Sequence, residues 1–259
     1  MRFLGLPAAL VAAAVLAGCA GSMSESGDGV APAPASASVI APPATPAPNG
    51  TSAGSAAALL SRLPVKGRAP KTGYSRDRFG QAWADTDRNG CDTRNDILRR
   101  DLRDVTVRPG THGCVVLSGI LADPYSGTTM SFRRGPSTSI EVQIDHVVAL
   151  SDAWQTGAFA WISRKLLAFA NDPLELLAVD GVLNEQKSDA DAASWLPPNK
   201  AYRCAYVARQ VAVKAKYGLW VTPPERDAMA RILTGCPAQQ APSGPMPTVA
   251  PFDAPVSRG

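Results

Sequence analysis

Two low-complexity segments confine the part of the chain that can fold. Residues 20–60 and 237–259 consist mainly of Ala, Pro, Ser, Gly and Thr. Segments of this composition bury too little apolar surface to offset the conformational entropy that folding removes. The sequence therefore predicts one folded domain at residues 61–236, a disordered tether at residues 19–60 and a disordered tail at residues 237–259.

The first residues of the chain are typical of an export signal. Arg2 precedes an apolar run from Leu4 to Leu16, which ends in the sequence Leu-Ala-Gly-Cys. A basic start, a short hydrophobic core and small residues before the cleavage point describe a secretory signal. The cysteine makes it resemble a bacterial lipoprotein signal, which implies removal of residues 1–18, lipidation of Cys19 and attachment to the outer face of the cell membrane. Without lipidation, the same signal predicts a secreted protein.

Export determines how the other four cysteines are interpreted. Disulfides persist outside the cytosol, and four cysteines allow three pairings. We favour the pairs Cys91–Cys114 and Cys204–Cys236, because each closes a loop of moderate length within one segment. A zinc site is less favoured, since no C-x-x-C spacing occurs.

Hydrophobic periodicity predicts a mixed α+β domain. Helices are expected at residues 76–83, 94–102, 151–170, 184–195, 201–217 and 224–233. Strands are expected at residues 105–107, 114–120, 131–134, 140–148 and 174–179.

Residues that carry catalytic chemistry gather between positions 141 and 198. Asp145 and His146 end a strand-like run, and Asn184 and Lys187 share one face of a helix because they are three residues apart. A carboxylate, an amide oxygen and an imidazole suit Mg²⁺ or Mn²⁺ better than Zn²⁺. A single histidine is a natural general base for activating water.

This part of the sequence resembles the HNH (ββα-metal) nuclease superfamily, and more closely the HNH-type domain at the carboxyl terminus of the GmrSD restriction endonucleases. The matching runs are IDHVVALSDAW, ANDPLELLAVDG, NEQKSDADAASWLPP and CAYVARQVAVKAKYGLWV, with FGQAWADTDRNGCDTRNDIL and DPYSGTTMSF upstream. The resemblance covers nearly all of residues 73–236. It implies a ββα-metal core that is elaborated with extra helices and short strands and stabilised by disulfides.

The resemblance also implies individual roles for five residues. His146 matches the general base that activates the attacking water, and Asp145 matches the metal ligand before it. Asn171 matches the asparagine that holds the loop between the two strands and the catalytic histidine; the alternative is a turn residue. Asn184 completes the metal site, and its alternative is a helix N-cap. Lys187 either faces the phosphate or stabilises the helix.

The function that these matches imply is hydrolysis of phosphodiester bonds in DNA, with RNA as an alternative substrate, by a metal-dependent endonuclease. The metal would stabilise the leaving oxygen. No protein partner is predicted, and a monomer is expected. The alternative is a non-catalytic envelope lipoprotein that binds nucleic acid or calcium. The presence of Asp145, His146 and Asn184 together favours catalysis, because a binding protein needs no water-activating base.

A second motif resembles the start of an EF-hand calcium loop, with staggered oxygens and a glycine at the sharp turn. Its ligands would be Asp85, Asp87, Asn89 and Asp96. Calcium is the less favoured interpretation, because the twelfth position is usually Glu and Asp92 stands where an apolar residue is expected. The competing interpretation is a disulfide-held turn that presents Arg94 to a phosphate backbone. Arg133 and Arg134 are further candidates for phosphate contacts, and the net charge of +4 suits such a partner without requiring it.

Overall fold

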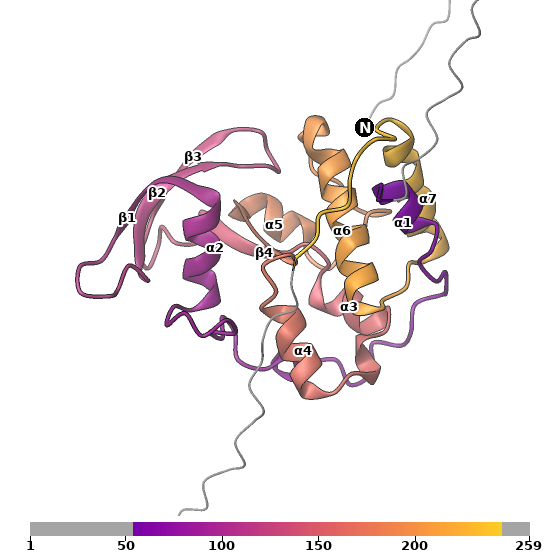
Figure 1. Cartoon of the computed structure of the whole chain (residues 1–259), viewed down its shortest axis with the longest axis horizontal. Helices are drawn as coiled ribbons and strands as arrows, with labels where there is room; N and C mark the ends of the chain where they lie inside the picture. The colour runs from indigo at the N-terminus through magenta and orange to yellow at the C-terminus, as the bar shows by residue number, and fades with distance from the viewer. Residues whose placement is uncertain (1–53, 245–259) are drawn as a thin grey trace, which may run out of the picture. The chain divides into compact units, whose positions relative to one another are not determined.

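The computed structural model describes residues 54–244. The predicted leader, Cys19, most of the predicted tether and most of the predicted tail lie outside these residues. The described residues form an α+β fold with small antiparallel sheets and several helices (Figure 1), which confirms the predicted fold class. None of the described helices is long and apolar enough to cross a bilayer.

The strands form a three-stranded sheet of order β1-β2-β3 and a two-stranded sheet of β4 and β5, both antiparallel. The strands are β1 (Leu102–Val107), β2 (Val116–Ala122), β3 (Thr129–Arg133), β4 (Val142–His146) and β5 (Leu176–Asp180). The helix α2 contacts β1, β2 and β5 (Figure 1), and its buried Ile97 and Leu98 join the core residues of both sheets. The two sheets are therefore connected through one helix.

The other helices pack around the two-stranded sheet and contribute two further core clusters. The helices are α1 (Ala56–Leu60), α2 (Thr93–Asp101), α3 (Leu150–Gln155), α4 (Ser163–Ala170), α5 (Gly181–Lys187), α6 (Arg203–Tyr217) and α7 (Pro223–Thr234), with 3-10 turns η1 (Arg76–Phe79), η2 (Ala158–Ala160) and η3 (Lys200–Tyr202). A capping box of Thr222 and Glu225 starts α7, and Pro223 occupies its first turn. The predictions of α6 and α7 are correct to within two residues.

Two predicted helices are interrupted at glycines. The helix expected at residues 76–83 is only the short turn η1, because Gly80 has a φ of 81° and turns the chain away. The helix expected at residues 151–170 is divided into α3, η2 and α4, because Gly157 has a φ of 136°. The apolar composition of these segments conceals both breaks.

The helix expected at residues 184–195 is misplaced. It begins at Gly181, directly after β5, and ends at Lys187. The chain leaves the helix at Ser188, whose φ is 51°. The prediction was wrong because the helix follows β5 without a connecting loop, and Asp180 both ends the strand and caps the helix.

The folded unit extends beyond both predicted boundaries. The run AAALL, expected in the tether, forms α1, and its Ala56 and Leu60 are buried against α6 and α7. The backbone N–H of Ala56 donates to the carbonyl of Gln239, and Ser55 forms an antiparallel bridge with Gln240. Residues 54–60 and 237–241 are therefore part of the fold, because a few apolar side chains within low-complexity segments find a buried surface.

Two disulfides join Cys91 to Cys114 and Cys204 to Cys236. The first ties the loop before α2 to a residue two positions before β2. The second ties the beginning of α6 to the second residue after α7. These are the two pairs that the cysteine spacing favoured.

Candidate active site

A ββα unit of β4, β5 and α5 lies at the centre of the described residues (Figure 1). The antiparallel register places His146, at the end of β4, opposite Leu176 at the start of β5. Asp180 ends β5 and caps α5, since its carboxylate accepts a hydrogen bond from the backbone N–H of Leu183. In the sequence, the helices α3 and α4 lie between β4 and β5. The unit thus brings the end of β4 and one face of α5 together.

His146 is buried, and its imidazole is held by two contacts. Its Nε2 lies 2.9 Å from the carbonyl oxygen of Ala170, and its ring stacks on Trp83 with the centroids 6.2 Å apart. A carbonyl oxygen only accepts, so Nε2 carries the proton and Nδ1 keeps a lone pair. Burial and the positive charge of Arg76 lower the pKa of His146 to about 3, although the bond to Ala170 opposes this. The imidazole is therefore neutral at neutral pH, as a general base requires.

Asp145 and Lys187 form a buried ion pair behind the strand end. The carboxylate of Asp145 accepts a hydrogen bond from the hydroxyl of Tyr125 at 2.5 Å and lies 2.9 Å from Nζ of Lys187. Lys187 also donates to the carbonyl of His146 at 2.8 Å. Burial raises the pKa of Asp145, while Lys187 and Tyr125 oppose the rise. Because Lys187 is fully buried, its ammonium group holds α5 to the end of β4.

Asn184 is half-buried on α5 and lines the cleft above the ββα unit. Its Nδ2 donates to Oε1 of Gln143 at 2.8 Å, and Gln143 in turn donates to Glu185 at 3.1 Å. Within residues 54–244, no group donates a hydrogen bond to Oδ1 of Asn184. Asp180 is the N-cap of this helix, so the N-cap interpretation of Asn184 is wrong. The amide oxygen of Asn184 is therefore available to bind a ligand.

Asn171 is fully buried at the end of α4. Its Nδ2 donates to the carbonyl of Leu167 at 3.0 Å and to that of Gln81 at 3.4 Å. The residue before it, Ala170, supplies the carbonyl that faces His146. Asn171 therefore acts on the imidazole indirectly. It stabilises the backbone segment whose Ala170 carbonyl orients the ring of His146.

Glu175 holds the loop that follows His146. Its backbone carbonyl accepts from the N–H of Val147 at 2.9 Å, and both carboxylate oxygens lie 3.2 Å from the N–H of Val148. Burial raises the pKa of Glu175 well above its ordinary value, although the bond from Val148 opposes this. Glu175 thus holds the start of the connection between β4 and β5, while Asn171 bonds to Leu167 near its end.

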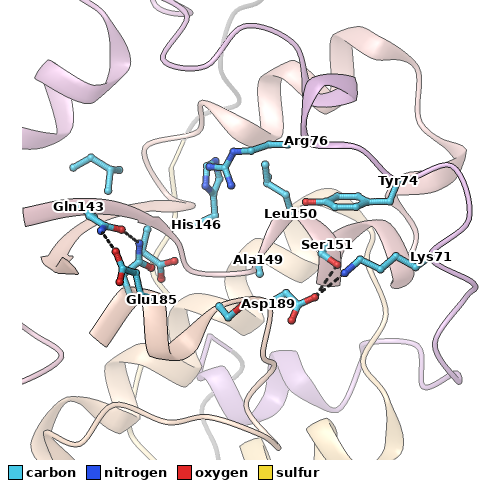
Figure 2. A pocket seen from close by; sticks show the side chains of 14 residues that line it. Lys71, Tyr74, Arg76, Gln143, His146, Ala149, Leu150, Ser151, Glu185 and Asp189 are labelled. Carbon is cyan, nitrogen blue, oxygen red and sulfur yellow. Dashed lines mark hydrogen bonds and ion pairs between the residues drawn. The ribbon is translucent and has the colours of Figure 1, made fainter. Parts of the chain in front are cut away.

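A polar cleft of about 480 Å³ opens above the ββα unit. Figure 2 shows the side chain of Arg76 reaching His146 on one wall, with Gln143 and Glu185 on one side of them and Lys71 on the other. Within residues 54–244, the guanidinium of Arg76 makes no hydrogen bond or ion pair, whereas Lys71 pairs with an aspartate. Arg76 is therefore a free cation beside the candidate general base.

The three arginines predicted to contact phosphate lie outside the cleft. Arg94 donates to the carbonyls of Ser139 and Val142, and Arg134 donates to the carbonyl of Val116 and to a neighbouring side chain. Arg133 is exposed on β3. The contacts of Arg94 and Arg134 favour a structural role, because their guanidinium groups are engaged with backbone oxygens.

The predicted calcium loop brings its four residues together around Asn89. The backbone N–H of Asn89 donates to Asp85 at 3.1 Å and to Asp87 at 3.2 Å. Its side-chain amide donates to Asp87 and Asp96, both at 3.1 Å. These donors satisfy the carboxylates within the loop, and calcium binding here stays a prediction.

A second group of carboxylates is buried between α3, α6 and α7. Ligand atoms of Asp152, Asp191 and Glu225 lie within 4.8 Å of one another, a spacing that a metal ion could span. Two cations already occupy the group: Nζ of Lys214 is 2.9 Å from Asp152 and 2.7 Å from Glu225. Arg68 is 2.9 Å from Asp152 and 2.8 Å from Asp191. We interpret the group as a structural ion cluster, because two cations bind its three carboxylates and none of the three residues lines the polar cleft.

Replacing Glu225 by glutamine should weaken the pH dependence of stability. Burial raises the pKa of Glu225 from 4.5 to about 7, with Asp152 and Asp191 adding to the rise and Lys214 opposing it. Between these pH values the folded chain holds a proton that the unfolded chain has released. The free energy of unfolding should therefore fall as pH rises from 4.5 to about 7. In Glu225→Gln the contribution of this group to the fall should be absent.

Urea unfolding of the oxidised chain across this pH range measures the effect. Glu185→Gln, at an exposed glutamate, is the matched control and should follow the unmodified chain. An unchanged decline in Glu225→Gln would contradict the prediction.

Four side chains of the site were not identified from the sequence: Trp83, Arg76, Tyr125 and Glu175. Trp83 and Tyr125 lie in runs that matched the resemblance, FGQAWADTDRNG and DPYSG, but nothing in those runs indicates which residue they contact. Arg76 lies far from β4 in the sequence, at the start of η1. Their positions depend on chain segments that only the tertiary fold brings together.

The fold and the site together define an α+β protein with a ββα unit, in which a strand ends in Asp-His and the following helix carries Asn-x-x-Lys. The family model of the GmrSD restriction endonuclease C-terminal domain matches residues 92–232, and the chain belongs to this family. A protein of Arthroderma benhamiae described as an uncharacterized secreted protein is 40% identical over 198 residues, which cover 76% of this chain and 91% of that protein. No solved structure matches the chain.

Proposed function

We infer that the protein is an exported, metal-dependent endonuclease of the HNH type that hydrolyses phosphodiester bonds in DNA, with RNA as the alternative substrate. The observation that carries this inference is the state of His146. Its Nε2–H is committed to the carbonyl of Ala170, which leaves Nδ1 unprotonated, and the residue lines a polar cleft. A neutral imidazole with a lone pair on Nδ1 is able to take a proton from water.

The donor groups around His146 fit a hard divalent cation. A carboxylate has about four lone-pair sites, and Asp145 uses two of them for Tyr125 and Lys187. The amide oxygen of Asn184 adds a second oxygen ligand. Oxygen donors of this kind suit Mg²⁺ or Mn²⁺. A cation held by Asp145 and Asn184 would neutralise phosphate charge and stabilise the leaving oxygen.

The remaining steps belong to the chain's own residues. The Nδ1 atom of His146 accepts the proton of the water that attacks phosphorus. Arg76, beside His146, binds a non-bridging phosphate oxygen through its free guanidinium. Trp83 and Ala170 keep the imidazole in one orientation, so that the base does not have to be ordered when substrate binds.

Two features support a site of action outside the cytosol. The described domain contains two disulfides, which persist in oxidising compartments. The leader ends in Leu-Ala-Gly-Cys, which favours a lipid anchor at Cys19 and a position on the outer face of the cell membrane. The alternative of a non-catalytic lipoprotein that binds nucleic acid or calcium predicts binding without cleavage.

Plasmid cleavage with added Mg²⁺, Mn²⁺, Ca²⁺ or EDTA tests this function. The oxidised chain should nick the plasmid with Mg²⁺ or Mn²⁺ and not with EDTA. Asn184→Ala should need at least about tenfold more metal for half-maximal cleavage, because it removes an oxygen ligand. Val182→Ala, at an exposed position on the same helix, is the matched control. Absence of cleavage of DNA and RNA with every metal would support the binding alternative.

A further inference from the structure

An exposed apolar patch lies away from the cleft, where the loop between α3 and α4 meets the segment after α6. Among residues 54–244, Ile162 is the most exposed large hydrophobic side chain, at 66%, and Phe159 is 47% exposed. Phe159 makes an edge-to-face contact with Trp220, with ring centroids 6.2 Å apart. Trp161 is half-buried beside Ile162. We call Phe159, Trp161, Ile162 and Trp220 the aromatic patch.

Cationic side chains surround the aromatic patch. The ammonium of Lys66 lies 5.1 Å from the ring of Trp220, and that of Lys165 lies 4.2 Å from the ring of Trp161. Arg164 is exposed next to Lys165. Other cations of the neighbouring segments, Arg68, Lys71, Lys214 and Lys216, pair with carboxylates. The three cations at the patch, Lys66, Arg164 and Lys165, are complementary to an anionic surface.

Hydrogen bonds hold the patch in place. The backbone N–H of Trp220 donates to the carbonyl of Thr156 at 3.0 Å, and its indole N–H donates to the carbonyl of Gly67 at 3.0 Å. Lys165 donates to the carbonyl of Tyr217 at 2.8 Å. Because the loop is tied to its neighbours, little side-chain ordering is needed on contact with a partner.

We propose that the aromatic patch docks on an anionic phospholipid bilayer. Trp and Phe rings and an aliphatic side chain at a loop tip enter the interface between headgroups and acyl chains, while Lys and Arg contact the anionic headgroups. A nucleic acid would use the cations and the rings but would leave Ile162 in water. None of the patch residues lines the cleft of the candidate active site. A lipid surface therefore accounts for both the exposed apolar side chains and the neighbouring cations.

Binding to phospholipid vesicles tests the proposal. The mature chain, residues 19–259 without the lipid, is mixed with phosphatidylcholine vesicles that contain or lack phosphatidylglycerol, and the bound fraction is measured by co-sedimentation. The chain should bind the anionic vesicles and bind neutral vesicles weakly. The double variant Phe159→Ser/Ile162→Ser should bind the anionic vesicles about tenfold less, since it removes the inserted apolar groups.

The matched control is Ile140→Ser/Val182→Ser, which changes two side chains of similar exposure, 57% and 64%, elsewhere on the surface. This control should bind like the unmodified chain. Equal binding by both double variants, or loss of plasmid binding without loss of vesicle binding in Phe159→Ser/Ile162→Ser, would overturn the proposal. Cleavage of free plasmid should be unchanged in this variant, so the proposal and the nuclease function fail separately.

Discussion

Replacing His146 by alanine should reduce metal-dependent plasmid cleavage by about 100- to 10,000-fold, the usual effect of losing a general base. No other imidazole is in a position to substitute, because the chain's second histidine, His112, is exposed in a loop and does not line the cleft. The expected loss follows from geometry: Ala170 binds one ring nitrogen of His146 and leaves the other as the acceptor. Initial rates of nicking at a fixed Mg²⁺ concentration measure the effect.

A control at His112 separates catalysis from general loss of an imidazole. His112→Asn suits this position because the residue has a φ of 49°, which asparagine tolerates. Its cleavage rate should equal that of the unmodified chain. Circular dichroism of His146→Ala should show a retained fold, although its stacking partner Trp83 loses a contact. Equal cleavage by His146→Ala and the unmodified chain would mean that His146 is not the base or that a contaminant cleaves the plasmid.

Replacing Lys187 by methionine should lower the free energy of unfolding by about 3–5 kcal/mol, because it leaves a buried carboxylate without its cation. The Nζ of Lys187 lies 2.9 Å from Asp145, and the two side chains are 0% and 5% exposed. Methionine fills a similar volume, so the loss reports on charge and not on a cavity. Urea unfolding of the oxidised chain at neutral pH gives the value.

The matched control is Lys71→Met, because Lys71 lies at the same distance, 2.9 Å, from Asp189 with both side chains about half exposed. It should cost no more than about 1 kcal/mol, since solvent screens the charges and solvates the partner left behind. The double variant Lys187→Met/Asp145→Asn should recover part of the loss, because it removes both buried charges. Similar losses in Lys187→Met and Lys71→Met would show that burial of the Lys187 pair has no energetic importance.

The sequence predicted the catalytic motifs better than their contacts. The adjacency of Asp145 and His146 and the spacing of Asn184 and Lys187 are local properties, and the structure brings all four to the ββα unit. The start of the helix containing Asn184 was predicted three residues too late, since α5 follows β5 directly, with Asp180 as its N-cap. That error made an N-cap role for Asn184 a reasonable alternative, which the capping contact of Asp180 excludes.

The contacts of individual side chains were beyond the sequence where they join distant segments. Lys187 was expected on a helix face, but its partner Asp145 is 42 residues away, so its burial depends on how α5 packs against β4. The contacts of Glu175 with the backbone after His146 could not be predicted, because the register of β4 and β5 sets which residue faces that segment. Arg94 and Arg134 were available for phosphate in the sequence, but packing of α2 and β2 engages them with carbonyls.

By itself, the sequence determined the α+β class, the residue types of the site and the favoured disulfide pairs. These follow from periodicity, from motif spacing and from the short separations between cysteines, which are all properties of neighbouring residues. Only the tertiary structure decided the tautomer of His146, the burial of the Asp145–Lys187 pair and the stacking of Trp83 on His146. The hydrogen-bond partners and the burial of a side chain depend on which distant segments pack together. Local sequence patterns do not specify this packing.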